Sequence, residues 1–548
     1  MKSFFIKTGL LAVLMLTLFA CDNVLDEYNP SGLTSETVFT TPEGFETLVN
    51  AAYTYQRWWY GKEEAYNIAE TGTDIWTSGA GEVYRDLTQY LNLQGSNAAL
   101  ASEWREFYAA INLCNGGIAR IDKAGLSAAL RPVREGELRF LRAFYYWHIV
   151  ETWGGVHFTT EETNGIIATA NKTPVETFYK QIFEDLKIAV SNLPATQPQY
   201  GRVTKGAAQA FLARMYLTRG MYKESLEMAE AVLKGNYGYK LEDNYANLWK
   251  MSNLKTKEAI YVVDYSANLT INDLANSTFN PYGHSRGSNN AHLLFLMKYD
   301  DRPGMVRDLA NGRPFNRYMP TRFLLDLYSE DDARYEGSFT EVWYANSTSR
   351  PAGMNLGDTA VYCTRKEIPD AVEATKKYQT IDRSKIYLPD GTVRDNLRYP
   401  SLSKFMDPTR ASLNEAQSAR DVFVIRLAEV YLIAAEAQMQ LGNLQLAADY
   451  INVLRTRAAK PGKTASMQIK PAQLNIDFIL DERARELAGE QIRWFDLKRT
   501  GKLVERIKAH SPDNAINVQA FHILRPIPQT QLDAVVNKDE FKQNEGYQ

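Results

Sequence analysis

Three short stretches carry residue types that could do chemistry. Gly283 to Gly287 (GHSRG) has the G-x-S-x-G spacing of a hydrolase nucleophile, but that turn requires a buried apolar strand directly before it. The residues from Asn276 to Tyr282 are polar and contain a proline, so the required strand is missing. Gly462-Lys463-Thr464 is similar to part of a phosphate-binding loop, but Arg457 stands where the first glycine is needed. Neither stretch therefore predicts an active site.

The third stretch, from Asp481 to Arg499, offers several carboxylates that a glycosidase could use as an acid and base pair. It is also loaded with cations, four arginines and one lysine against five carboxylates, and Ile479, Leu480 and Leu487 give it the apolar face of a helix. We therefore favour ion pairing on and between helices. Six scattered histidines and three cysteines are too few for a metal cluster at a known spacing. We expect no enzyme activity, no metal and no cofactor.

Aromatic residues are the unusual part of the composition, because 32 Tyr, 23 Phe and 9 Trp occur in 548 residues. Tyrosine combines an apolar ring face with a polar tip, which is typical of binding surfaces. The candidate ligand-binding residues are Trp76 with Tyr84, Arg85 and Asp86; Trp58, Trp59 and Tyr60; Tyr282 with Asn289 and Asn290; and Trp343 with Tyr344. For each of these the alternative is a partly buried aromatic residue that packs between a helix and a loop.

The overall charge does not favour nucleic acid as a partner. The chain has 62 basic and 65 acidic residues, for a net charge of −3, so there is no positive field to attract a phosphate backbone.

The N-terminus predicts export and lipidation. Lys2 and Lys7 precede an apolar run from Gly9 to Ala20, which is too short to span a bilayer but fits a secretory signal over residues 1–20. Ala20-Cys21 is similar to a bacterial lipobox, which would leave Cys21 as a lipidated N-terminus; the alternative is a signal whose cleavage site merely contains a cysteine. Residues 21–42 are predicted to be a tether. Cys114 lies in a helical pattern as a small buried residue, and whether it pairs with Cys363 is left open.

Apolar periodicity predicts helices over 102–122, 133–151, from Pro174 to before Pro194, and 203–219. A helix, a glycine turn and a second helix occur around Gly220 and again, 222 residues later, around Gly442. Both pairs resemble tetratricopeptide helix pairs, with Ser225 and Ala447 as the small residues that allow close approach. Residues 239–419 are predicted to be rich in loops, with short strands such as 259–263 and short helices. The predicted fold is mainly α, with tetratricopeptide-like helix pairs as a scaffold and a loop-rich region of short strands and helices that carries the ligand site.

Four segments in chain order resemble the RagB/SusD family, a family of outer-membrane lipoproteins of Bacteroidetes. The segments are Leu138 to Trp147 leading to Trp153-Gly154-Gly155-Val156, Ile425 to Leu432 with Glu436-Ala437, Glu482 to Arg499, and Arg525-Pro526-Ile527-Pro528 followed by Gln543 to Tyr547. The resemblance covers essentially the whole chain after the signal. Gly489, Gln491, Arg525 and Glu545 depart from the residues that are common at these positions.

This resemblance implies a non-enzymatic protein that caps a SusC-like TonB-dependent transporter, captures oligosaccharide at the cell surface and passes it on. Its helical scaffold would pack on the transporter, its ligand site would lie in the loops on the opposite side, and lipid on Cys21 would hold it in the outer leaflet. The aromatic candidates agree with this, because sugar rings stack on aromatic faces. The implied division is a helical region over 43–270 and a C-terminal region over 271–548, with tetratricopeptide-like helices near 420–500. The alternative is a peptide-binding or other nutrient-binding lid of a RagA-like transporter.

Overall fold

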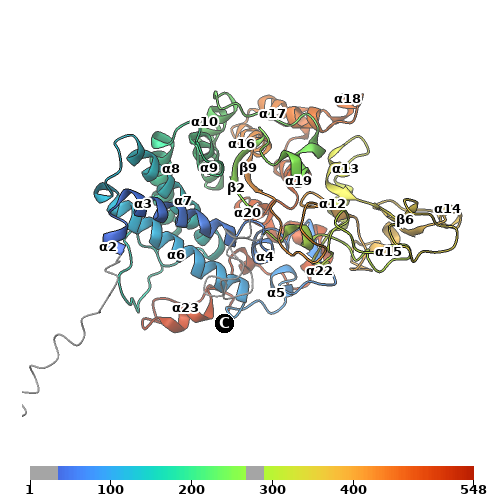
Figure 1. The fold of residues 1–548 in the computed structure, drawn as a ribbon, viewed down its shortest axis with the longest axis horizontal. Helices are drawn as coiled ribbons and strands as arrows, with labels where there is room; N and C mark the ends of the chain where they lie inside the picture. Colours follow the sequence, from blue (N-terminus) through green and yellow to red (C-terminus); the bar gives the residue numbers. More distant parts are fainter. Residues whose placement is uncertain (1–34, 267–288) are drawn as a thin grey trace, which may run out of the picture.

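The computed structural model describes residues 35–266 and 289–548, and long helices dominate it (Figure 1). The long helices are α3 (Pro42–Thr54), α6 (Ala98–Arg120), α7 (Leu130–Trp153), α8 (Val175–Asn192), α9 (Lys205–Thr218), α10 (Tyr222–Leu233), α16 (Leu427–Gln440), α17 (Leu444–Ala458) and α19 (Ile476–Leu487). The four helices predicted between residues 102 and 219 are confirmed as α6 to α9. None of the helices in the described ranges is both long and apolar enough to cross a bilayer.

The two glycine turns fold as predicted. Gly220 and Gly442 have φ of +69° and +83°, in the left-handed region that favours glycine, and each joins two packed helices. Ser225 is fully buried, and its hydroxyl donates to the Ala213 carbonyl of the facing helix at 2.9 Å. Helix α10 also packs against α16, so two helix pairs that lie far apart in the sequence stack side by side as one scaffold.

Shorter helices surround this scaffold. In the first half they are α2 (Ser35–Val38), the 3₁₀ helix η2 (Tyr55–Trp58), α4 (Glu63–Ala69), α5 (Arg85–Thr88) and the 3₁₀ helix η4 (Tyr245–Trp249). In the second half they are α11 (Ala291–Leu294), α12 (Arg322–Asp326), α13 (Arg334–Ser338), α14 (Asp370–Glu373), α15 (Arg383–Ile386), α18 (Thr464–Met467), α20 (Arg493–Arg499), α21 (Leu503–His510), α22 (Pro512–Ala515) and α23 (Gln529–Ala534).

The strands are short and form four small sheets in the described residues. Antiparallel pairs join β1 (Trp76–Ser78) to β3 (Tyr318–Pro320), β2 (Ala259–Val263) to β9 (Val422–Arg426), and β4 (Phe339–Thr340) to β8 (Ser401–Leu402). In the fourth sheet β5 (Val342–Tyr344) pairs antiparallel with β6 (Thr359–Cys363), which pairs parallel with β7 (Gln379–Ile381). The strand expected at 259–263 is confirmed, and its pairing with β9 ties the loop-rich region to the scaffold.

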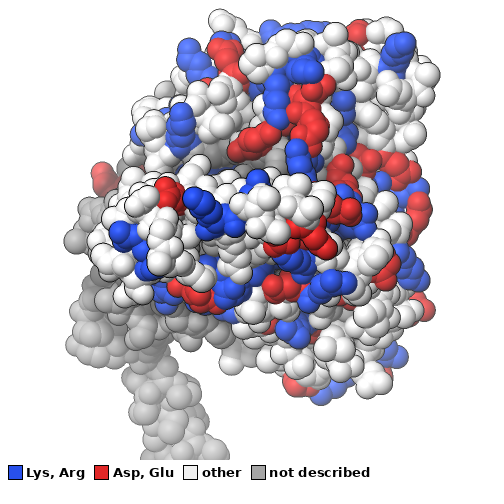
Figure 2. Space-filling model, turned by 90° about the vertical axis from the view of Figure 1, so that its right-hand side faces the viewer, with Lys and Arg blue, Asp and Glu red and all other residues white. Residues whose placement is uncertain are grey.

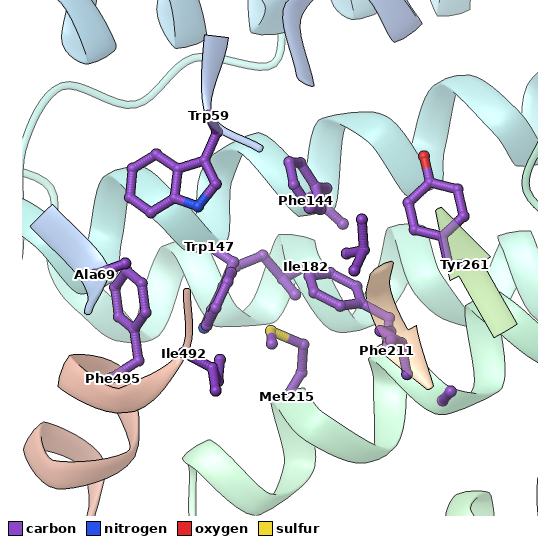
Figure 3. Packing of buried hydrophobic residues seen from close by; sticks show 14 of the residues in the cluster. Trp59, Ala69, Phe144, Trp147, Ile182, Phe211, Met215, Tyr261, Ile492 and Phe495 are labelled. Atoms are coloured by element: carbon purple, nitrogen blue, oxygen red, sulfur yellow. The ribbon is translucent and has the colours of Figure 1, made fainter. Parts of the chain in front are cut away.

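Two apolar cores lie under these layers. The larger is beneath the helices, where Trp59 directly after η2, Trp147 of α7 and Phe495 of α20 pack together, with the Trp147 and Phe495 ring centres 4.8 Å apart (Figure 3). The second core lies under the loop-rich region. Cys114 is buried in the first core and Cys363 in the second, and both thiols are free. The prediction that Cys114 is a small buried residue is therefore confirmed.

Candidate functional site

The predicted tryptophan platforms are wrong, because the structure buries them. Trp76 is 0% exposed: its indole nitrogen donates to Glu70 Oε1 at 2.9 Å and its ring meets Phe295 with 4.8 Å between ring centres. Trp58, Trp59 and Trp343 are 5%, 1% and 3% exposed, and Tyr60 is 3% exposed. Pairing of β1 with β3 places the Trp76 ring in the core under the loop-rich region, where burial of a large apolar ring is most favourable. These rings present no face to a ligand.

The two predicted asparagines are structural as well. Asn289 and Asn290 are buried, and their amide nitrogens donate to the main-chain carbonyls of Arg420 at 2.8 Å and Ala416 at 2.7 Å. They hold one loop against another, so their prediction as ligand-binding residues is corrected. Tyr282, Cys21 and the 283–287 sequence lie outside the described residues.

Tyr84, Arg85 and Asp86 remain accessible at the start of α5. Arg85 is exposed, Tyr84 and Asp86 are half-buried, and Asp86 Oδ2 accepts from the Asn97 amide at 2.6 Å. The neighbouring loop contains Glu82, whose carboxylate accepts the Tyr84 main-chain N–H at 2.7 Å. Burial raises the pKa of Glu82 to about 7, because the charged form loses its hydration there.

This raised pKa predicts a pH-dependent effect of Glu82→Gln. The folded chain keeps a proton on Glu82 that the unfolded chain releases near pH 4.5, so this group's contribution to stability falls as pH rises from about 4.5 to about 7. Glutamine does not titrate. As pH rises from 5 to 8, the unsubstituted protein should lose stability that Glu82→Gln keeps. We therefore expect the free energy of unfolding of the variant, relative to that of the unsubstituted protein, to increase by roughly 3 kcal/mol at most. Urea unfolding at both pH values measures this, and an equal difference at both would contradict it.

A polar cleft lies at the edge of the scaffold and is called here the Tyr200 cleft. Its volume is about 480 Å³, and its walls are the end of α3 with η2, the turn at 199–202 and the end of β2. The lining residues are Asn50, Tyr53, Thr54, Gln56, Arg57, Gln199, Tyr200, Gly201, Arg202, Val262, Val263 and Asp264. An adjoining hollow of about 210 Å³ shares the turn and Val262 and adds Tyr237 and Tyr239.

Ion pairs and hydrogen bonds hold the rings and cations of this cleft in place. Arg202 donates to Glu137 Oε1 at 3.0 Å and to Asn50 Oδ1 at 2.6 Å, and its guanidinium lies 5.7 Å from the centre of the Tyr53 ring. Tyr200 is 36% exposed, and its hydroxyl donates to the Leu254 carbonyl at 3.1 Å. Its ring is therefore held in place and partly exposed, with Lys255 Nζ 4.9 Å from the ring centre over one face.

Gln56 adds an unused donor to the cleft. It is 2% exposed, and its Oε1 accepts from the Tyr261 hydroxyl at 2.6 Å. Its Nε2 has no hydrogen-bond partner among the described residues. A buried amide N–H without a partner costs free energy, so an acceptor from a ligand would be favoured here.

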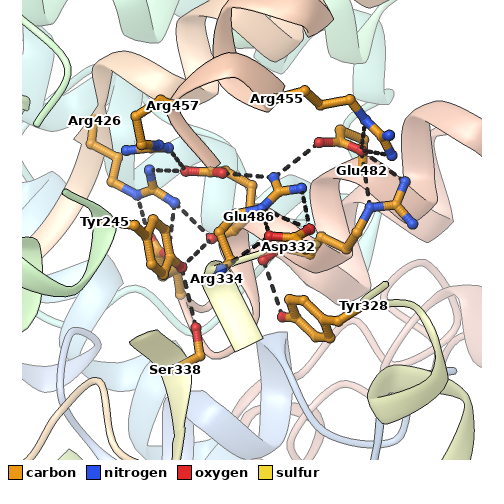
Figure 4. A network of polar contacts seen from close by, with 12 residues as sticks. Tyr245, Tyr328, Asp332, Arg334, Ser338, Arg426, Arg455, Arg457, Glu482 and Glu486 are labelled. Carbon is orange, nitrogen blue, oxygen red and sulfur yellow. Dashed lines mark hydrogen bonds and ion pairs between the residues drawn. The ribbon is translucent and has the colours of Figure 1, made fainter. Parts of the chain in front are cut away.

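The acid-rich run at 481–499 is an ion network, as favoured from the sequence. Glu482 and Glu486 of α19 are fully buried and receive hydrogen bonds from several arginines, including Arg334 at 2.9 Å to each (Figure 4). The arginine charges lower the pKa of both carboxyls, which keeps them ionised. A general acid needs the opposite shift, so these carboxylates are not suited to that role.

The Tyr200 cleft could not be located from the sequence, because its walls come from three distant segments. The one local signal is Gln199-Tyr200-Gly201-Arg202, where an aromatic and a cation stand in a turn between two helices. Nothing local shows that Tyr53 and Asp264 lie beside this turn.

The described chain is thus a helical-repeat scaffold with polar, tyrosine-lined hollows at its edge. The family model described as the SusD family matches residues 257–547, and one described as starch-binding associating with outer membrane matches 24–217. The chain belongs to the SusD family.

Its relatives cover nearly its whole length. SusD-like protein P2 of Formosa agariphila is 26% identical, over 98% of each chain, and starch-binding protein SusD of Bacteroides thetaiotaomicron is 24% identical, over 88% of this chain and 85% of that one. A solved laminarin-binding SusD-like protein has the same fold, with 22% identity and a TM-score of 0.70 over 92% of this chain and all of its own.

Proposed function

We propose that this protein is a cell-surface glycan-binding lipoprotein that captures oligosaccharide and delivers it to a SusC-like TonB-dependent outer-membrane transporter. Membership of the SusD family supports this, as do relatives and neighbours whose names refer to binding of starch, laminarin and surface glycans. It acts without enzymatic turnover or a cofactor, and lipid on Cys21 anchors it in the outer leaflet.

The Tyr200 cleft is the observation that carries the proposal. A sugar offers an apolar ring face and many hydroxyls, and it is bound by aromatic faces beside amide and guanidinium groups. The cleft supplies the Tyr200 ring, the unpaired Gln56 amide N–H and the Arg57 and Arg202 guanidiniums around about 480 Å³. That volume is within the usual range for a small-molecule site. Tyr84, Arg85 and Asp86 are proposed as further, accessible contacts.

Tyr200→Ala tests the site. The variant removes the exposed part of the Tyr200 ring, which is worth on the order of 1 kcal/mol as a stacking surface, so we expect the Kd for the bound glycan to rise about 5- to 10-fold. Isothermal titration calorimetry with laminarin, starch and oligosaccharides of both measures this, and binding on the order of micromolar to millimolar is expected. Leu446→Ala is the control, because Leu446 is 50% exposed on α17 and outside the cleft. A Kd unchanged by Tyr200→Ala would contradict this site, and no heat from any glycan would contradict the function.

A second candidate function is capture of a peptide or another nutrient for a RagA-like transporter. The burial of all nine tryptophans favours it, because the large open platforms that suit sugars are then missing. A peptide mixture titrated in the same calorimeter distinguishes the two functions.

A further inference from the structure

A second cleft lies at the other end of the molecule and is called here the Arg398 cleft. Its volume is about 420 Å³, and its walls are strand β7, Glu373 at the end of α14, Lys385 of α15, the segment 395–398 and Arg302. It shares no lining residue with the Tyr200 cleft. Helices α14 and α15 and strand β6 of this region lie at the right-hand end in Figure 1, whereas α3 and α8 lie in the left half.

Arg398 is buried in this cleft with part of its hydrogen-bonding capacity unused. It is 6% exposed, and its Nη2 donates to Asp301 Oδ2 at 2.8 Å. Its Nε and Nη1 have no partner within the described chain, and the same holds for the buried Oε1 of Gln379 on β7. The cleft therefore holds unpaired donors and an unpaired acceptor, each of which is costly to leave without a partner.

The charges around the cleft balance. Lys385 pairs with Glu373, Arg302 and Arg398 share Asp301, and Asp395 lies on the same wall. Figure 2 shows this end of the molecule with basic and acidic side chains interspersed over its surface. A phosphate or another anion would find no surplus positive charge here.

The chemistry of the cleft instead fits hydroxyl groups. A hydroxyl accepts a hydrogen bond from a guanidinium and donates one to an amide oxygen, so one kind of group satisfies both Arg398 and Gln379. Tyr378 adds a half-buried ring to the lining. A peptide also has donors and acceptors, but its side chains need apolar pockets. The aliphatic side chains of this lining are those of Ile381 and Leu397, so the cleft offers a peptide little apolar surface.

We infer that the Arg398 cleft is a second binding site for hydroxyl-rich sugar units, separate from the Tyr200 cleft. The inference rests on the proposed function, since it takes the ligand to be a glycan. Two sites on one chain let a long polysaccharide bind at both, which raises its apparent affinity without stronger contacts at either.

Calorimetric stoichiometry with laminarihexaose and maltohexaose tests the second site. We expect two molecules of the bound hexasaccharide per chain in the unsubstituted protein and one in Gln379→Ala. Tyr378→Ala, at the half-buried ring, is a second variant that leaves the Arg398 contacts intact and is expected to weaken the same site about fivefold. Lys377 is an exposed neighbour, so Lys377→Ala is the matched control and should still bind two hexasaccharide molecules per chain.

Each other outcome overturns the inference. A stoichiometry that stays at two in Gln379→Ala with unweakened binding in Tyr378→Ala places the second sugar elsewhere. A stoichiometry of one in the unsubstituted protein overturns the second site and leaves the proposed function standing. No binding of either sugar overturns both, and binding of a tryptic casein digest that Gln379→Ala abolishes would identify a peptide site instead.

Discussion

Replacing Glu486 by alanine is expected to lower the free energy of unfolding by about 3 to 5 kcal/mol. The Glu486 carboxylate is fully buried and accepts from Arg334 at 2.9 Å, from Arg426 at 2.7 Å and from Arg457. Alanine would leave three guanidiniums around a buried site with one carboxylate fewer. An unpaired buried charge is far costlier than the loss of an exposed ion pair.

The loss should spread beyond α19, because this network joins elements from distant parts of the chain. Arg334 begins α13, Arg426 ends β9 and Arg457 lies on α17, so Glu486 links the loop-rich region to the scaffold helices (Figure 4). The Glu486 carbonyl also accepts from the Tyr245 hydroxyl at 3.1 Å.

Urea unfolding followed by circular dichroism measures this effect. Glu505→Ala is the matched control, because Glu505 is exposed on α21 and pairs with Lys502 at 2.8 Å, and it should cost less than 1 kcal/mol. Glu486→Gln keeps a hydrogen-bond acceptor without the charge, so its loss in free energy of unfolding should lie between those of Glu486→Ala and Glu505→Ala. A loss below 1 kcal/mol in Glu486→Ala would show that the network contributes little to stability.

Trp76→Ala is expected to cost about 3 to 5 kcal/mol of stability, which makes it a folding variant rather than a binding variant. The Trp76 ring is fully buried against Phe295, and its removal leaves a cavity and one donor fewer at Glu70. Trp76→Phe keeps most of the volume and should retain glycan binding, since no face of Trp76 reaches the solvent.

Thermal unfolding and calorimetry together separate these effects. Tyr344→Ala, on an exposed ring of the same region, should change stability by less than about 0.5 kcal/mol. A folded Trp76→Phe protein that no longer binds glycan would place Trp76 in the binding site and contradict its burial.

The helices were predictable because the signal for them is local. In α7 the apolar residues recur at helical spacing and the helix ends at Trp153, before Gly154 with φ of +74°. The same holds for α9 and α10 at Gly220. The packing of α10 against α16 was not predictable, because no local residue pattern in either helix indicates which distant helix it contacts.

Gln491 shows how a departure from the family pattern is accommodated. It has φ of +57°, in the left-handed region that favours glycine, and its side chain donates to the Trp59 carbonyl at 2.9 Å and accepts from the Gly61 N–H at 3.1 Å. These bonds offset the strained backbone, and they depend on a segment more than 400 residues away in the sequence.

The sequence by itself determined the helical scaffold, the loop-rich region, the ion-paired character of the 481–499 run and the family, because periodicity, turn glycines and motifs are properties of neighbouring residues. Only the tertiary structure decided which aromatic rings face solvent. Trp76 and Tyr200 both stand in short, turn-rich segments, yet Trp76 is 0% exposed and Tyr200 36%. That difference follows from which distant surfaces pack over each ring, since burial depends on the whole fold and not on the residues beside it in the chain.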